Sequence, residues 1–210
     1  MAYGDFRFPQ VLLDLGLTTR EADLFSGVEA VVPRPDFAET VAAGATLALA
    51  IDSEKARSEF MIAPVLVELH RQLGGAFALF SGIELNVDPS RGLNGVCDFI
   101  ISGSPRQFFL TAPLVTIVEV KNDNPRNGLG QCIASMVAAS LLNEKAGSPV
   151  DMVFGVVTTG GDWRFLRLEG ATVTLDLREY YIADPGKILG ILRSFVEVGG
   201  RSGITPPPAP

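Results

Sequence analysis

Apolar residues recur three or four positions apart in three long segments of the chain, and this spacing predicts helices. The first segment spans residues 53–73; Pro64 can kink it, and two glycines follow its end. The second spans residues 127–145, with Asn127 as the expected cap, and the third spans residues 185–198. These three segments are therefore expected to pack one apolar face against a common core.

Runs rich in β-branched and aromatic residues, separated by turn-forming residues, predict the strands. These runs cover residues 77–87, 95–102, 114–121, 151–158, 163–169 and 172–181. The resulting order is helix, three strands, helix, further strands, helix, and it is not a repeating βαβ pattern. It predicts an α/β fold in which helices flank a mixed central sheet.

The two ends of the chain differ from this central part. Residues 1–51 are expected to form small helical pieces broken by prolines, an N-terminal extension that packs on the core. Residues 199–210 are rich in proline and glycine and are expected to form a flexible tail. The main domain is therefore assigned to residues 52–198.

The overall composition favours one well-buried domain, because 47% of the 210 residues are hydrophobic. The longest nearly uninterrupted apolar stretch, residues 41–51, is far shorter than a membrane-spanning helix requires, and no secretory signal opens the chain. Two cysteines do not make a disulfide framework or a zinc site, and the single histidine, His70, gives no basis for a Ser-His-Asp or Cys-His hydrolase. We expect a cytoplasmic protein, and the positive mean hydropathy of +0.29 would also suit a homodimer.

The net charge of −7 argues against a surface that binds nucleic acid unselectively. A local basic groove can nevertheless exist in an acidic protein. Arg91, Arg106, Lys121 and Arg126 all lie in one third of the chain and could contribute to such a groove.

Three charged residues lie inside or against strongly apolar predicted strands: Asp98, Glu119 and Lys121. A charge in a buried strand costs several kcal/mol unless another group compensates it. Residues two apart in a strand face the same way, so Glu119 and Lys121 should share a face, and Asp98 joins them if its strand is adjacent. Asp98, Glu119 and the backbone carbonyl of Val120 could then supply oxygen ligands to Mg²⁺.

With this pattern the chain resembles the PD-(D/E)XK nuclease superfamily over roughly residues 53–160. Gly95-Val96-Cys97-Asp98 corresponds to the family's P-D element, with Cys97 in place of proline, and Glu119-Val120-Lys121 corresponds to its E-x-K element. The resemblance implies a restriction-endonuclease-like α-βββ-α-β core and hydrolysis of phosphodiester bonds in nucleic acid, DNA rather than RNA. It also implies that Asp98 and Glu119 bind Mg²⁺ or Mn²⁺ and that Lys121 is catalytic.

The same resemblance implies two assisting residues on the flanking helices. Glu59, with Glu54 as a substitute, occupies the place of a glutamate on the first helix, and Gln131 occupies that of a glutamine on the helix after E-x-K. The segments S-E-K-A-R-S-E and G-V-C-D-F-I-I are also similar to an uncharacterised cyanobacterial-type protein family, which implies no established activity.

Other interpretations of these residues remain open. Asp98, Glu119 and Lys121 could form an internal ion pair without a metal, or belong to a non-catalytic module that only binds a partner. Glu59 could be a solvated helix charge, and Gln131 could satisfy backbone groups in the first turn of its helix.

Overall fold

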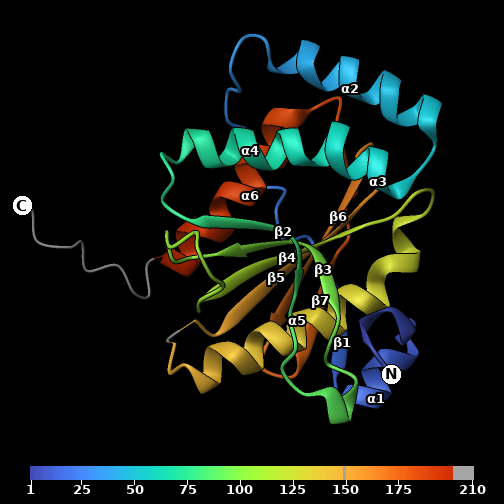
Figure 1. Cartoon of the computed structure of the whole chain (residues 1–210), viewed down its shortest axis with the longest axis vertical. Helices are drawn as coiled ribbons and strands as arrows, with labels where there is room; N and C mark the ends of the chain where they lie inside the picture. The colour runs from blue at the N-terminus through green and yellow to red at the C-terminus, as the bar shows by residue number, and fades with distance from the viewer. Residues whose placement is uncertain (149, 201–210) are drawn as a thin grey trace, which may run out of the picture.

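The computed structural model describes residues 1–148 and 150–200 as one mixed sheet covered by helices on both faces (Figure 1). The strands are β1 (Thr18–Ala22), β2 (Ala78–Glu84), β3 (Val96–Ser102), β4 (Leu114–Val120), β5 (Met152–Thr158), β6 (Asp162–Glu169), β7 (Thr172–Asp176) and β8 (Tyr180–Tyr181). The helices are α1 (Gln10–Leu15), α2 (Phe37–Ile51), α3 (Glu54–Arg57), α4 (Ala63–Gln72), α5 (Leu129–Lys145) and α6 (Pro185–Gly200).

The strand order across the sheet is β1-β7-β6-β5-β4-β3-β2, and β8 pairs with β6. Two neighbouring pairs are parallel, β1 with β7 and β4 with β5, and the remaining pairs are antiparallel. The parallel connection from β4 to β5 runs through α5, since parallel strands need a long crossover. The elements from α3 to β5 follow the α-βββ-α-β order, so the predicted α/β fold class with a mixed, helix-flanked sheet is confirmed.

The helices form two layers on opposite faces of the sheet (Figure 1). The layer that contains α2, α4 and α6 packs on one apolar core, to which β4 contributes Val118 and Val120. The layer that contains α1 and α5 packs on the other core, to which β4 contributes Ile117. The alternation along β4 therefore directs Glu119 toward the α5 layer.

The predicted helix over residues 53–73 is divided into two by a π-helical turn, Ser58–Ile62. In a regular helix the carbonyl of Phe60 would accept a hydrogen bond from residue 64, but Pro64 has no backbone N–H. Gly44 of α2 packs against the Phe60 carbonyl, so closely that a Cβ atom there would overlap it. In place of the expected kink at Pro64, the helix forms the wider π-helical turn, and α2 packs against this turn.

The prediction for residues 1–51 is wrong for one segment. Residues 18–22, expected to be helical, form the edge strand β1, which pairs with β7 about 150 residues later. Its residues are mostly exposed, so it lacks the apolar alternation by which a strand is recognised. The rest of this region packs on the core as expected: Tyr3 and Val11 are buried against the α5 layer, and Phe37 of α2 lies in the opposite core.

Three smaller differences concern element boundaries. Asn127 does not cap α5: it lies in a 3-10 turn, Pro125–Gly128, and the N-cap of α5 is Gly128. The cap of that turn is Asn124, whose Oδ1 atom accepts a hydrogen bond of 2.9 Å from the backbone N–H of Arg126. The run at residues 172–181 forms two short strands, and α6 continues to Gly200.

Positions 201–210 of the expected tail lie outside the described residues. Within the described part of the chain, none of the helices has both the length and the apolar character to cross a membrane.

Candidate functional site

Asp98 and Glu119 lie on adjacent antiparallel strands, where β3 pairs with β4. Phe99 is paired with Val118, so Asp98 and Glu119 lie one step further along the same register. The Oδ2 atom of Asp98 accepts a hydrogen bond of 2.8 Å from the backbone N–H of Val120. This bond fixes the carboxylate of Asp98 against the end of β4, next to the E-x-K segment.

Glu119 and Lys121 form a direct ion pair at this end of β4. The Lys121 Nζ atom lies 2.7 Å from the Oε1 atom of Glu119. Glu119 is 1% exposed, whereas the Lys121 side chain is 17% exposed, so the ammonium group lies between the buried carboxylate and solvent. The structure therefore brings together Asp98, Glu119 and Lys121, as the sequence pattern indicated.

A glycine at the start of α5 makes this packing possible. A Cβ atom at Gly128 would lie 2.6 Å from Cγ1 of Val157 and 3.1 Å from the Cγ atoms of both Glu119 and Lys121. Since real Cβ atoms do not approach other atoms as closely as 2.6 Å, the backbone before α5 can cover the stems of the two charged side chains only with glycine here. The start of α5 thus holds the ion pair in place.

The electrostatics of the site disfavour the simultaneous ionisation of Asp98 and Glu119. Burial, followed by the charge of Asp98, raises the pKa of Glu119 to about 8. Burial likewise raises the pKa of Asp98, although the hydrogen bond from Val120 opposes it. Burial alone would lower the pKa of Lys121, but the carboxylate of Glu119 outweighs it and the net shift is upward. Glu119 pairs directly with the Lys121 ammonium group, whereas Asp98 has no ion-pair partner among the described residues, and a further cation would stabilise the ionised forms of both acids.

The two assisting residues implied by the resemblance occupy different environments. Gln131 lines an open cavity of about 400 Å³ together with Lys121, so it lies beside the site. Glu59 is not part of the cluster: its side chain is 52% exposed and pairs with Lys55 at 2.8 Å. Glu54 comes closer, because its Oε1 atom lies 3.9 Å from the Lys121 Nζ atom.

The geometry of helix α3 explains why Glu54 and not Glu59 approaches the site. Arg57 of this helix points to the same region, where its Nε atom donates to Oδ1 of Asn122 at 2.9 Å and its Nη1 atom donates to the carbonyl of Thr159 at 3.2 Å. Residues three apart share a helix face, as Glu54 and Arg57 do, whereas residues two apart point in nearly opposite directions. Glu59 follows Arg57 by two positions and is therefore turned away.

Sequence reasoning missed Arg57 and Arg7. Arg57 connects α3 to the segment after β4, and Arg7 lines the same cavity as Lys121 and Gln131. Arg57 lies in the S-E-K-A-R-S-E segment, which implies no established activity, and Arg7 belongs to no recognisable motif. Their positions depend on contacts between distant segments, and no local pattern in the sequence could have indicated them.

The ligand set suits a hard divalent cation better than zinc. Among the described residues, no group of three or more histidine, cysteine, aspartate or glutamate side chains could hold a metal. Two carboxylates with a backbone carbonyl are nevertheless the type of partial shell that Mg²⁺ uses, since Mg²⁺ usually keeps several of its waters. The uncompensated acids Asp98 and Glu119 fit such an ion.

Comparisons with known proteins identify no family for this chain. No protein-family model matches the chain, and no curated protein sequence matches it. Among solved structures, the chain is similar to part of DrdV in its complex with DNA, with a TM-score of 0.40 and 12% sequence identity. The similarity covers 82% of this chain but only 14% of the DrdV chain. At this TM-score the similarity supports no functional assignment, so the function of this chain has to be inferred from its own residues.

Proposed function

We propose that the protein is a Mg²⁺- or Mn²⁺-dependent hydrolase of phosphodiester bonds in nucleic acid, with DNA as the expected substrate. The observation that carries this proposal is the cluster of Asp98, Glu119 and Lys121 at adjacent strand positions. In this cluster Glu119 is buried and pairs with Lys121 at 2.7 Å, whereas Asp98 is half-buried and forms no ion pair with any of the described residues. An internal ion pair would need only one acid, and the second is what a metal site requires.

Each residue of the cluster then has a distinct role. Asp98, Glu119 and the carbonyl of Val120 would hold the ion, which when bound supplies Lewis-acid chemistry to a phosphate oxygen or a water molecule. Lys121, partly open to solvent, is suited to orient a water molecule and to offset the negative charge that develops on phosphorus. Gln131, which lines the cavity beside Lys121, is suited to hydrogen-bond substrate or water there.

Thermal unfolding with and without Mn²⁺ tests the metal site. A ligand that binds only the native state raises the melting temperature by mass action, so we expect Mn²⁺ to stabilise the wild-type protein. The Asp98→Ala variant should lose this stabilisation. Glu59→Ala serves as the matched control, because Glu59 is exposed and outside the cluster, and it should keep the full effect.

Cleavage assays on plasmid DNA, single-stranded DNA and RNA test the activity. Metal-dependent cleavage should fall by about 100-fold or more in Lys121→Ala, the size of effect expected when a group that acts in the transition state is removed. If Mn²⁺ gives no stabilisation and no substrate is cleaved, the proposal is wrong.

The second candidate function is a non-catalytic module that binds a nucleic-acid or protein partner through the same fold. It is favoured by one observation: the Lys121 ammonium group already pairs with Glu119 at 2.7 Å, so this buried acid has a partner without a metal. The same unfolding experiment separates the two candidates. A module without a metal site would show no Mn²⁺ effect in the wild type or in Asp98→Ala.

A further inference from the structure

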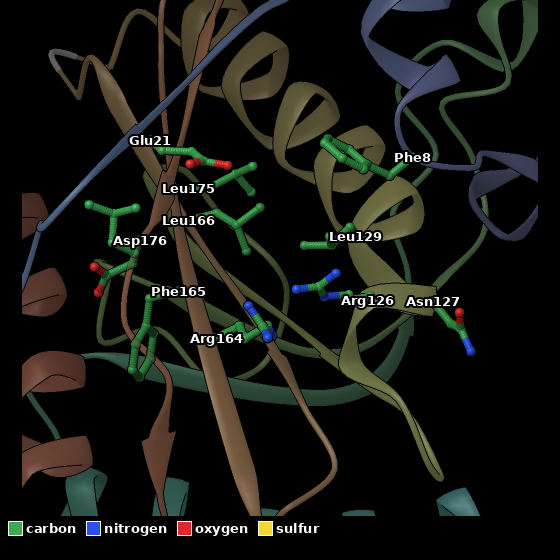
Figure 2. A pocket seen from close by; sticks show the side chains of 11 residues that line it. Phe8, Glu21, Arg126, Asn127, Leu129, Arg164, Phe165, Leu166, Leu175 and Asp176 are labelled. Carbon is green, nitrogen blue, oxygen red and sulfur yellow. The ribbon is translucent and has the colours of Figure 1, made fainter.

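The side chain of Arg126 lies where two surface cavities meet. The first, here the Lys121 cavity, is lined by Gly4, Arg7, Phe8, Lys121, Arg126, Asn127 and Gln131. The second, here the Arg164 cavity, has a volume of about 540 Å³ and is shown in Figure 2. Its lining residues include Glu21, Arg164 and Asp176. Phe8, Arg126 and Asn127 line both, so the cavities adjoin at the start of α5.

The Lys121 cavity is cationic in a protein whose net charge is −7. Three of its lining residues are cations, Arg7, Lys121 and Arg126, and no carboxylate is among the described residues that line it. Lys121 is paired with Glu119, and Arg7 donates to the backbone carbonyl of Phe6 at 3.0 Å. The Arg126 guanidinium forms no hydrogen bond or ion pair with any other residue in the described ranges, so it is available to an anion.

The positive charge continues into the Arg164 cavity. Figure 2 shows the guanidinium groups of Arg126 and Arg164 directed toward one another, from the start of α5 and from β6. Burial, together with the nearby charge of Arg126, lowers the pKa of Arg164, although Arg164 also pairs with Glu179. The two guanidinium groups repel each other, and an anion bound between them would remove this electrostatic repulsion.

Glu179 compensates part of the charge of Arg164, but the two acids that line the Arg164 cavity, Glu21 and Asp176, form no ion pair with Arg126. The Asp176 carboxylate already accepts hydrogen bonds from the hydroxyl of Tyr180 at 3.0 Å and from the backbone N–H of Leu24 at 3.2 Å. Glu21 lies on β1, the edge strand, and Figure 2 shows it at the far end of the cavity from Arg126. The cationic part of the cavity is thus the part next to the Lys121 site.

The N-terminal segment forms a fixed wall of this region because of Gly130. A Cβ atom at Gly130 would lie 2.5 Å from the carbonyl oxygen of Phe6 and 2.8 Å from the carbonyl carbon of Arg7. The backbone of residues 6–7 therefore lies directly on the first turn of α5. This contact holds Arg7 beside Lys121 and Arg126, although more than a hundred residues separate them in the sequence.

We infer that Arg7, Arg126 and Arg164 bind successive phosphates of a nucleic-acid strand and lead it to the Lys121 site. The inference rests on the proposed function, which requires a nucleic-acid substrate. A row of cations across two adjoining cavities suits a polymer with repeated charges, whereas a single phosphate would occupy only one cavity. Each neutralised phosphate releases counterions, so such binding depends on salt concentration.

The test is binding of a fluorescent single-stranded DNA oligonucleotide to the full chain in EDTA, where no metal-dependent cleavage occurs. Arg126→Ala should weaken binding by about five- to tenfold at low salt and reduce the salt slope by about 0.7, the value for one phosphate contact. Arg126→Lys should keep most of the affinity, since the charge is retained. The matched control is Arg193→Ala, which removes the same charge from an exposed pair with Glu197 on α6.

The inference would be overturned by no oligonucleotide binding by the wild type at low salt, by equal affinities for Arg126→Ala and Arg193→Ala, or by displacement of the oligonucleotide by inorganic phosphate at a matched concentration of phosphate groups. The last would indicate a single-anion site. A neutral-backbone methylphosphonate oligonucleotide should bind much more weakly than DNA, and equal binding would also contradict the inference.

Failure of this inference can be distinguished from failure of the proposed function. If Mn²⁺ stabilises the protein and DNA is cleaved, but Arg126→Ala binds DNA normally, the strand takes another path and the proposed activity stands. If Arg126→Ala weakens binding but no cleavage is found with any metal, the binding path stands and the proposed activity is wrong.

Discussion

The carboxylate of Asp98 accepts a 2.8 Å hydrogen bond from the backbone N–H of Val120, which ties the acid on β3 to the strand that carries Glu119. The side chain of Asp98 thus has a structural contact in addition to its proposed role as a metal ligand. The two roles can be separated by substitution. The hydrogen bond from Val120 needs only an oxygen acceptor on residue 98, whereas a metal ion needs the negative charge of the carboxylate.

The first prediction compares Asp98→Asn with Asp98→Ala. Asparagine keeps an oxygen that can accept from Val120, whereas alanine leaves that N–H without a partner, a cost of about 1–3 kcal/mol. The alanine variant should therefore be the less stable of the two in urea unfolding, while both lose stabilisation by Mn²⁺. Equal stabilities, or Mn²⁺ stabilisation retained in Asp98→Asn, would contradict the assignment.

The second prediction concerns the pH dependence of stability. The pKa of Glu119 is raised from 4.5 to about 8 in the folded protein, so between these values the native state holds a proton that the unfolded state has lost. This group therefore makes the free energy of unfolding fall as the pH rises through that window, by roughly 1–4 kcal/mol. Glu119→Gln cannot titrate and should show a flatter profile in urea unfolding without metal.

The exposed Glu59 provides the control for this pH profile, and Glu59→Gln should follow the wild type. Bound metal should also flatten the wild-type profile, because the cation replaces the proton on the carboxylate. A wild-type profile without any decline across this window would mean that Glu119 is not protonated in the native state.

The third prediction tests the contact between α2 and the π-helical turn. A Cβ atom at Gly44 would overlap the carbonyl oxygen of Phe60, so Gly44→Ala should force the two helices apart and destabilise the protein by about 1–3 kcal/mol. The higher helix propensity of alanine would offset part of this loss. Gly27→Ala is the control, since a Cβ atom there meets nothing within 4 Å. Urea unfolding of the two variants checks the prediction, and a Gly44→Ala variant as stable as Gly27→Ala would refute the close packing.

The fourth prediction concerns Asn143 of α5, which is buried against the start of β4. Its Oδ1 atom accepts from the backbone N–H of Leu114 at 2.6 Å, and its Nδ2 atom donates to the carbonyl of Leu114 at 2.8 Å. Asn143→Ala would leave two buried backbone groups without partners and should cost about 2–4 kcal/mol. Hydrogen exchange at Leu114 should become faster, whereas the exposed Asn127→Ala variant should change neither thermal stability nor exchange.

The sequence determined much of the fold and the centre of the candidate site. The predicted strands that become β2, β3 and β4 follow one another along the chain, so their pairing needs only short connections. Once β3 and β4 are adjacent, Asp98 and Glu119 lie close together, and the side shared by Glu119 and Lys121 follows from the two-residue period. All of these depend on local spacing, which can be read directly from the chain.

Only the tertiary structure decided which distant segments meet. β1 pairs with β7 through backbone hydrogen bonds, which leave no side-chain signature in an exposed edge strand such as residues 18–22. The choice of Glu54 over Glu59 depends on how α3 is turned toward the segment after β4, and the position of Arg7 depends on a close backbone contact with Gly130. Local patterns encode which residues are buried and at what spacing they recur along a helix or strand. Which charged side chains surround the Lys121 site is decided by close packing between segments that are remote in the sequence.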